Sequence, residues 1–395
     1  MKRIFSNLKY IKLNDFIAIL IFIFMIIPSL LFKLFNKIRN IKIMLICENG
    51  QTARDNGYHF YKYVRINHPD EYCYYVIDKK SEGYNSVKKY GNIIQYKSLK
   101  HWLYYLSATY NISSQKDGNP NAPLFYFFHV VLGLYNNRIF LQHGITKDNA
   151  KWLYYKNCKF KYFICGAKDE YNFIKNYFGY PKENVLYTGF ARFDNLYNNQ
   201  INKKQILIMP TWRQWLGRKT NSLGEKFIFE NTPFFKNWNN LLNDEKFIDF
   251  VEQNKIEIIF YPHMNMQQFL KSFSVNSKNI KIASMKTDIQ KVLKESSILI
   301  TDYSSVFMDF AYMLKPIIFY QFDYDEYREK QYDEGYYDYK NGFGPSLKNK
   351  NELINEIIKI YNNGLEKKYI DRMKSFFEIR DKNNCKRIYD EITKK

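Results

Sequence analysis

Two histidines each follow a short apolar run that has the composition of a buried strand. His143 comes directly after Arg138–Gln142 and is followed by Gly144, whereas His263 lies three residues beyond Ile256–Phe260. An imidazole has an unperturbed pKa of about 6.5, so a histidine at the carboxyl end of a strand is suited to general acid–base chemistry. A histidine held in a turn by a structural hydrogen bond also fits each position. The same pattern in both halves of the chain is more informative than either histidine alone.

Several polar side chains also occur together at a point where an apolar strand is followed by a helix. Ile298–Thr301 is followed by Asp302, Ser304 and Ser305, and a helical pattern begins there. Unpaired N–H groups and the helix dipole favour an anion at a helix start, and the two hydroxyls add donors. A plain serine cap on a buried helix fits the same residues and is compatible with anion binding. This segment therefore predicts a phosphate-binding turn.

Thr211 and Arg213 follow another predicted strand, Gln205–Met209. The planar guanidinium group matches the geometry of a phosphate, which makes Arg213 a candidate ligand, although an arginine packed against a neighbouring tryptophan fits equally well. Asp323 and Asp325 resemble a metal-binding D-x-D pair, but the acidic and aromatic residues around them disfavour a metal site. The chain has neither a Walker loop nor a G-x-G-x-x-G turn.

Short apolar runs alternate with polar, amphipathic stretches after residue 40, and this alternation predicts βαβ units with a mostly parallel sheet. A helix is expected over Asn56–Asn67. The expected strands of the first half are Ile41–Cys47, Tyr74–Asp78, Ile93–Tyr96, Ala108–Ser113, Arg138–Gln142, Lys161–Cys165 and Asn184–Thr188. Those of the second half are Gln205–Met209, Ile256–Tyr261, Ile280–Ala283, Ile298–Thr301 and Pro316–Tyr320.

The polar stretch Asn198–Lys204 is the best boundary between two such halves. We expect an anchor segment over 1–40, a first Rossmann-like domain over 41–200, a second Rossmann-like domain over 201–370, and a basic helix over 371–395. Two doubly wound α/β domains would face one cleft, with ligands beyond the carboxyl ends of their strands.

Charge and cysteine content narrow the class of protein. The 395 residues include 60 Lys or Arg and 39 Asp or Glu, a net charge of +21, and 46% hydrophobic residues, which excludes a mainly disordered chain. Compositional drift explains part of the charge, and the rest indicates an anionic partner. No RNP, KH or helix-turn-helix pattern supports a nucleic acid as that partner. Five scattered cysteines favour neither a disulfide framework nor a zinc site and suit a reducing compartment.

One segment, Phe16–Phe32, holds 17 residues without a charged side chain between basic flanks. It is slightly shorter than the roughly 20 residues that span a bilayer, contains Pro28, and is followed by no signal-peptide cleavage site. We expect a monotopic or re-entrant membrane anchor with both ends in the cytoplasm. A single span and a buried core helix are the alternatives.

Taken together, the motifs resemble the CDP-glycerol glycerophosphotransferase family, the teichoic-acid primases and polymerases, over most of Ile41–Ile370. The matching segments are Glu48–Asp70 (ENGQTARDNGYHFYKYVRINHPD), Leu141–Gly144 (LQHG), Thr188–Leu196 (TGFARFDNL), Pro210–Arg213 (PTWR), Tyr261–Met266 (YPHMNM) and Ser296–Tyr327 (SSILITDYSSVFMDFAYMLKPIIFYQFDYDEY).

That resemblance implies a GT-B-like fold and a transfer that needs no metal or other cofactor. The donor would be CDP-glycerol or CDP-ribitol, and the acceptor a hydroxyl of a lipid-linked glycan or polyol-phosphate chain. The product would be a teichoic acid or capsule-type polymer, made at the cytoplasmic face of the cell membrane without a nucleic-acid partner. A GT-B glycosyltransferase that uses a nucleotide sugar is the alternative activity.

The family motifs carry over to individual residues of this chain. His143 and His263 would be catalytic, with His143 as the base that deprotonates the acceptor. The donor phosphates would be held by Thr211, Arg213, Thr301, Asp302, Ser304, Ser305 and Asp309. The chain departs from the common family text where it has QHGITKD instead of WHGTPLK, and Ala191 and Met264 instead of proline. These departures affect the acceptor and the subgroup more than the chemistry.

Overall fold

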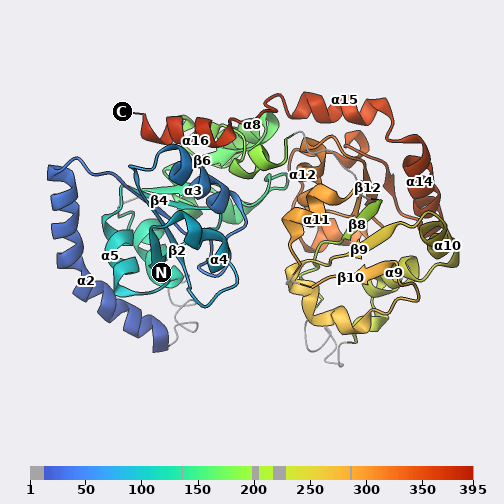
Figure 1. Cartoon of the computed structure of the whole chain (residues 1–395), viewed down its shortest axis with the longest axis horizontal. Coiled ribbons are helices and arrows are strands. Elements are labelled where there is room, and N and C mark those ends of the chain that lie inside the picture. The colour runs from blue at the N-terminus through green and yellow to red at the C-terminus, as the bar shows by residue number, and fades with distance from the viewer. Residues whose placement is uncertain are drawn as a thin grey trace. The chain divides into compact units, whose positions relative to one another are not determined.

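The computed structural model describes residues 13–116, 118–134, 137–197, 204–216, 228–284 and 287–394. Within these residues the chain forms two compact α/β units (Figure 1). Unit 1 holds the chain up to Ile145, Lys151–Asn195 and Asp381 onwards, and unit 2 holds Thr146–Ala150 and Leu196–Arg380. The predicted boundary lies largely outside the described residues, since 198–203 are not among them.

Unit 1 is built on a seven-stranded sheet in the order β3-β2-β1-β4-β5-β6-β7, with every neighbouring pair parallel. Its strands are β1 Ile43–Ile46, β2 Tyr72–Ile77, β3 Ile93–Gln95, β4 Tyr110–Ser113, β5 Arg138–Phe140, β6 Tyr162–Cys165 and β7 Val185–Tyr187. Strands β1 and β4 are buried along their whole length, as expected for a parallel sheet covered by helices on both faces.

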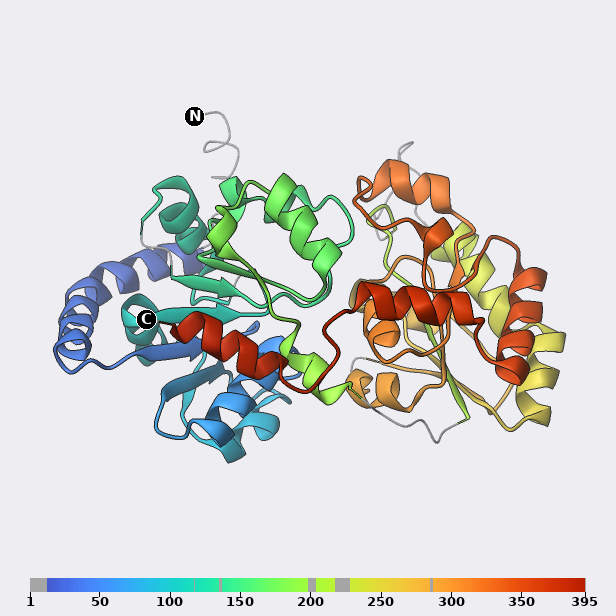
Figure 2. The ribbon, with the colours of Figure 1, turned by 90° about the horizontal axis from the view of Figure 1, so that it is seen from above.

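The helices of unit 1 lie around this sheet (Figure 2). They are α2 Leu13–Ile38, α3 Asn56–Asn67, α4 Tyr84–Val87, η2 Lys88–Tyr90, α5 Leu99–Ser107, α6 Ala122–Tyr126, η3 Phe127–Val131, η4 Lys151–Leu153, α7 Tyr155–Cys158, α8 Lys168–Tyr177, η5 Lys182–Asn184, η6 Ala191–Asn195 and α16 Asn384–Thr393. The predicted helix over Asn56–Asn67 is confirmed as α3, and it starts where the Asp55 side chain accepts the Asn56 N–H at 2.7 Å.

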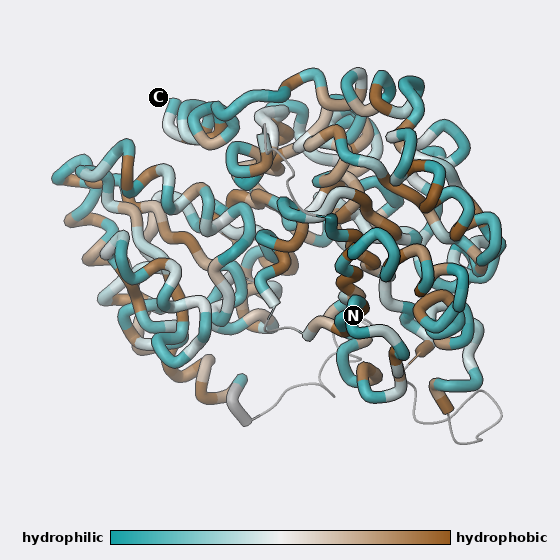
Figure 3. Tube along the Cα trace, turned by 45° about the vertical axis from the view of Figure 1, so that its right-hand side comes forward, coloured by the Kyte–Doolittle hydropathy of each residue, from teal (hydrophilic) through white to brown (hydrophobic). Residues whose placement is uncertain are grey.

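Unit 2 is built on a six-stranded parallel sheet in the order β10-β9-β8-β11-β12-β13. Its strands are β8 Gln205–Met209, β9 Glu257–Phe260, β10 Ile280–Ile282, β11 Ile298–Thr301, β12 Ile317–Tyr320 and β13 Ser346–Leu347. Its helices are η7 Phe229–Asn231, α9 Pro233–Leu242, α10 Glu245–Gln253, η8 Met264–Ser272, α11 Ile289–Glu295, α12 Val306–Tyr312, α13 Tyr324–Lys330, η9 Tyr339–Asn341, α14 Lys350–Asn363 and α15 Lys367–Phe376. Hydrophobic and hydrophilic stretches alternate along the chain in both units (Figure 3).

The predicted α/β class with parallel sheets is confirmed, and twelve of the thirteen strands found in the described residues overlap predicted ones. The exception, β13, has two residues and is too short to show an alternating pattern. The expected single helix over 371–395 is two helices, and α16 belongs to unit 1. The Asp194 carboxylate explains this, because it accepts the backbone N–H groups of Asn384 and Cys385 at 2.8 and 2.9 Å and so holds the start of α16.

Candidate functional site

The candidate residues lie at the carboxyl ends of strands, where ligands of doubly wound folds bind. In unit 1, His143 follows β5. In unit 2, Thr211, His263 and Asp302 follow β8, β9 and β11. His143, Thr211, His263 and Asp302 thus stand at the carboxyl-end edges of the two sheets.

His143 is aimed by its neighbour Gln142, whose backbone has a left-handed φ of 60°. Two contacts hold this conformation: the Gln142 Nε2 donates to the Ile164 carbonyl at 2.6 Å and to Glu170 Oε1 at 3.0 Å. The Asn56 amide also donates to the Gln142 carbonyl at 2.7 Å. A strained residue is retained only where its surroundings over-determine it, and such residues cluster at functional sites.

The His143 side chain is exposed, although protein atoms surround it closely enough to desolvate the ring. Desolvation lowers the His143 pKa, the Asp55 carboxylate opposes this, and Arg192 lowers the pKa further. His143 is therefore neutral at pH 7 and able to accept a proton from solvent or a ligand.

Asp55 and Arg192 near His143, and Glu48 beside Asp55, had no role in the sequence-based predictions. Asp55 and Arg192 form an ion pair at 3.0 Å, and both are largely buried. Glu48 is buried and accepts N–H groups from Asp55 and Tyr58; burial, and then the charge of Asp55, raise its pKa to about 8. All three residues lie in segments that match the family, and this match was the available signal in the sequence. No local pattern shows that Asp55 and Arg192, 137 positions apart, form a contact.

Arg213 is fully buried in unit 2 and holds two carboxylates together. Its Nε and one Nη bond Asp323 at 2.7 and 3.0 Å, and the same Nη lies 2.9 Å from Asp302. Burial acts to lower the Arg213 pKa, but the two carboxylates outweigh it and raise the pKa. The guanidinium carbon also lies 4.9 Å from the centre of the Tyr303 ring. This differs from the prediction that Arg213 presents its fork to a phosphate, because the guanidinium is 0% exposed.

Asp302 joins the loops that follow β8 and β11. One of its oxygens accepts the Thr211 and Tyr303 N–H groups at 2.8 and 2.6 Å, and the Thr301 hydroxyl donates to the Met209 carbonyl at 2.7 Å. Burial raises the Asp302 pKa, whereas Arg213 and the two N–H donors favour the carboxylate. We treat Asp302 as ionised because the other member of the pair, Arg213, cannot lose its proton.

His263, Ser304 and Ser305 are the candidate residues of unit 2 that keep partly exposed side chains. The His263 Nδ1 accepts the Asn265 N–H at 3.2 Å, which assigns the neutral tautomer with its proton on Nε2. His263 can therefore donate a hydrogen bond to an anion. The Ser304 hydroxyl is 3.5 Å from the Val306 N–H, the limit of a hydrogen bond, and the Ser305 side chain forms no helix cap.

The Thr211 hydroxyl is buried and has no hydrogen-bond partner among the described residues, which leaves a donor that the protein itself does not use. Asp309 is buried within α12. The structure thus separates the candidates of unit 2 into two sets. Thr211, His263, Ser304 and Ser305 offer donors, whereas Arg213, Thr301, Asp302 and Asp309 are buried among protein groups.

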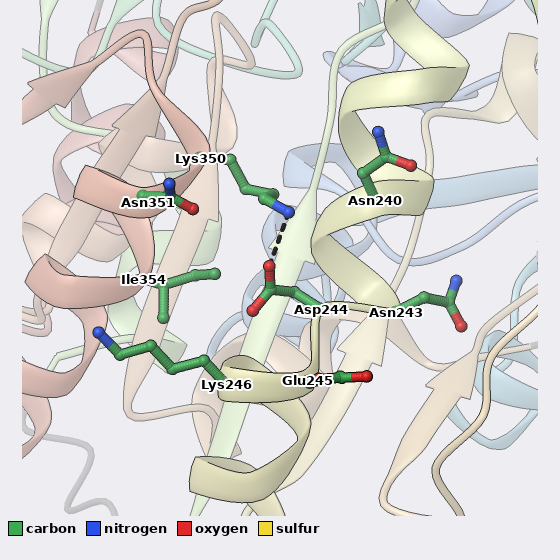
Figure 4. A pocket seen from close by; sticks show the side chains of 8 residues that line it. All are labelled: Asn240, Asn243, Asp244, Glu245, Lys246, Lys350, Asn351 and Ile354. Atoms are coloured by element: carbon green, nitrogen blue, oxygen red, sulfur yellow. Dashed lines mark ion pairs between the residues drawn. The ribbon is translucent and has the colours of Figure 1, made fainter.

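Asp323 is engaged by Arg213 and Tyr303 rather than arranged with other metal ligands. Among the described residues, no three His, Cys, Asp or Glu side chains are grouped to hold a metal ion. A polar groove of about 680 Å³ lies elsewhere on unit 2, between α9, α10 and α14, and is crossed by the Lys350–Asp244 ion pair at 2.6 Å (Figure 4). It contains none of the candidate residues.

Comparisons with known proteins bear on the family and the fold of the chain. The model of the CDP-glycerol:poly(glycerophosphate) glycerophosphotransferase family matches residues 29–394. The minor teichoic acid biosynthesis protein GgaB of Bacillus subtilis is 37% identical over 360 residues, which is 89% of this chain and 39% of GgaB. A teichoic acid glycerol-phosphate transferase of Staphylococcus aureus is 24% identical, and the match covers 88% of this chain and 90% of that protein. The chain thus spans about two fifths of the length of GgaB.

A solved structure of the wall teichoic acid polymerase TagF superposes with a TM-score of 0.67 at 19% identity, over 97% of this chain and 98% of that one. Another TagF structure was soaked with CDPG and has a TM-score of 0.60. These similarities confirm the predicted GT-B-like fold.

Proposed function

Because the chain belongs to the CDP-glycerol:poly(glycerophosphate) glycerophosphotransferase family, we propose that it transfers glycerol phosphate, or a related polyol phosphate, from a CDP-polyol to a hydroxyl of a membrane-linked acceptor. CMP is released, and the product is a teichoic-acid or capsule-type polymer. The observation that carries this proposal is the neutral, exposed His143 beyond β5 in a chain that matches this family over residues 29–394.

In the proposed reaction a ring nitrogen of His143 takes the proton of the acceptor hydroxyl. The hydroxyl oxygen attacks the β-phosphorus of the CDP-polyol and forms a new phosphodiester bond. The bond from that phosphorus to the bridging oxygen breaks, and CMP leaves with the electron pair. The lowered His143 pKa supports this role, because a base must be unprotonated at the working pH.

On the donor side, the Nε2–H of His263 and the hydroxyls of Thr211, Ser304 and Ser305 bind the phosphate oxygens. In this proposal Arg213 does not contact the donor but supports the residues that do. Its contact with Asp302 fixes the carboxylate that holds the Thr211 and Tyr303 backbone, and so orders the loops after β8 and β11. We therefore assign Arg213 and Asp302 as positioning residues for the donor. The transfer is proposed to need no metal.

We place the enzyme at the cytoplasmic face of a membrane. The five cysteines are free, which suits a reducing compartment. Helix α2 supports the membrane location, since Asp15–Ile38 is long and apolar enough to cross a membrane, with a mean hydropathy of 2.7.

The test is a donor panel with product analysis. The purified full chain is incubated with lipid-linked acceptor and with CDP-glycerol, CDP-ribitol or UDP-sugars, with and without EDTA. We expect CMP release from one CDP-polyol and a phosphorus-containing product, unaffected by EDTA. Release of a nucleoside diphosphate from a nucleotide sugar would instead identify a glycosyltransferase. His143→Ala is the control: it should bind the donor and release CMP about 10²–10⁴-fold more slowly than the wild type.

A further inference from the structure

The Asn56 side chain joins separate loops at the carboxyl edge of the unit 1 sheet. It stands in the first turn of α3 and is 0% exposed. Its Nδ2 donates to the Leu141 and Gln142 carbonyls at 3.2 and 2.7 Å. Its Oδ1 accepts the Arg192 N–H at 3.0 Å. Both ends of the amide are thus engaged, by partners that lie 85 to 136 positions away in the sequence.

One of these bonds acts directly on the proposed base. The Gln142 carbonyl belongs to the peptide group that also contains the His143 nitrogen, so Asn56 holds the peptide next to the base. Gln142 has a left-handed φ of 60°, a conformation that a residue other than glycine keeps only when its neighbours hold it there. Loss of the Asn56 bond would therefore let the peptide turn and the imidazole move with it.

The other bond fixes charge beside the base. Arg192 pairs with Asp55 at 3.0 Å, and these two residues act on the pKa of His143 in opposite directions. The Asn56 side chain binds the backbone of Arg192, while its own N–H donates to the Asp55 carboxylate at 2.7 Å. A single residue thus holds both members of the ion pair and the peptide that precedes the imidazole.

The first turn of α3 is itself fixed against the sheet, which makes Asn56 a rigid support. The Gly57 N–H donates to the Ser114 hydroxyl, beyond β4, at 2.6 Å. The Glu48 carboxylate, beyond β1, accepts the Asp55 N–H at 3.0 Å. A Cβ on Gly57 would lie 3.0 Å from Glu48 Cγ and 3.2 Å from Ser114 Oγ, so a glycine is needed for this close approach. A side chain can orient another group to a fraction of an ångström only from such a fixed element.

We propose that Asn56 is a positioning residue for His143, because it holds both the peptide before the base and the ion pair beside it. This inference rests on the proposed function, which takes His143 as the base. A purely structural role predicts that Asn56 variants lose stability. A positioning role predicts in addition that folded variants lose kcat and keep their donor KM, since the proposed donor groups belong to unit 2.

The first experiment uses Asn56→Asp, which keeps the size of the side chain but places a carboxylate against two carbonyl oxygens. Burial and the carboxylates of Glu48 and Asp55 raise the pKa of the new group, Arg192 opposes them, and the neutral His143 ring adds no charge. Asp55 and Arg192 largely offset each other, so burial dominates and the pKa is raised. The protonated form has an O–H and can again donate to a carbonyl.

We expect Asn56→Asp to lower kcat about 100-fold at pH 8 and about tenfold at pH 6, relative to wild type at the same pH. Asn111→Asp is the matched control. Asn111 is also buried, but its Nδ2 donates to the Tyr105 carbonyl at 2.9 Å and to Asn137 Oδ1 at 3.1 Å. This control should lower Tm and leave the kcat of the folded protein unchanged. A wild-type kcat in folded Asn56→Asp, or a deficit that grows toward pH 6, would overturn the proposal.

The second experiment needs no turnover. Asn56→Ser removes the Nδ2 group without placing a charge in the core. NMR titration of isotope-labelled histidine rings measures the His143 pKa, and His143→Ala assigns its signal. We expect a pKa below 6.5 in the wild type that moves toward 6.5 in Asn56→Ser, because the loosened loop lets water reach the ring.

The two experiments separate this inference from the proposed function. An unchanged His143 pKa in Asn56→Ser, or failure of both Asn56 variants to fold, would overturn the positioning role. If the pKa moves as expected but the wild type releases no CMP from any CDP-polyol, the proposed function fails and the support of His143 by Asn56 stands.

Discussion

Arg213→Met tests whether Arg213 supports unit 2 or contacts the donor directly. Methionine keeps most of the apolar stem but removes the charge between Asp302 and Asp323, which lie 2.9 and 2.7 Å from the guanidinium. Removal of one partner from a buried ion pair costs about 3–5 kcal/mol. Unit 2 has roughly 190 residues, and for that size about 1 kcal/mol corresponds to 2–4 °C in Tm. We therefore expect the Tm of unit 2 to fall by roughly 6–20 °C.

The fall in Tm caused by Arg213→Met should be larger at higher pH. In the variant, burial still raises the Asp302 pKa, while the opposing charge of Arg213 is gone. A carboxyl group with a pKa of about 3.9 in the unfolded state and a higher pKa in the folded state destabilises the fold only at pH values above about 3.9. This destabilisation grows as the pH rises. The difference in Tm between wild type and variant should thus be larger at pH 8 than at pH 5.

Scanning calorimetry at both pH values measures this, and CDP-glycerol binding is measured well below the Tm. Arg213→Lys is the matched control, since it keeps the charge but not the fork and should lose less stability. A variant that melts like the wild type but binds donor weakly would refute the buried-support role and restore the predicted phosphate contact.

The remaining predictions concern the candidate site. His143→Ala should lower turnover by about 10²–10⁴-fold with unchanged donor affinity. In the wild type, the acidic limb of the plot of rate against pH should lie below pH 6.5. Desolvation lowers the His143 pKa, so the base stays unprotonated to lower pH. Unchanged turnover would remove His143 from the mechanism. His263→Ala should weaken CDP-glycerol binding in calorimetry, and His263→Gln, which still offers an N–H, should recover part of it; equal losses would argue against the Nε2–H contact. Gln142→Ala should lower kcat about tenfold with little change in donor KM, because Gln142 and its bond to Glu170 orient the backbone before His143; a pure change in KM or Tm would contradict this.

Local sequence patterns were sufficient to predict most strands of the two sheets. Strands β8 and β11 have the predicted bounds, Gln205–Met209 and Ile298–Thr301, because each is a mainly apolar run followed directly by a residue unsuited to a strand interior, Pro210 or Asp302. Helix α3 likewise has its predicted limits. These features depend on neighbours in the chain, and so a single sequence contains them.

The sequence by itself also determined which residues stand at strand ends and that α2 is apolar enough to meet a membrane. Only the tertiary structure decided what surrounds them. Arg213 reaches a carboxylate 110 positions away and becomes buried, Asp55 pairs with Arg192 beside His143, and Ala18 and Met25 of α2 are buried although most of that helix is exposed. The physical reason is the same in each case: pKa, burial and the orientation of a helix depend on groups that are distant in sequence and meet only when the sheets assemble.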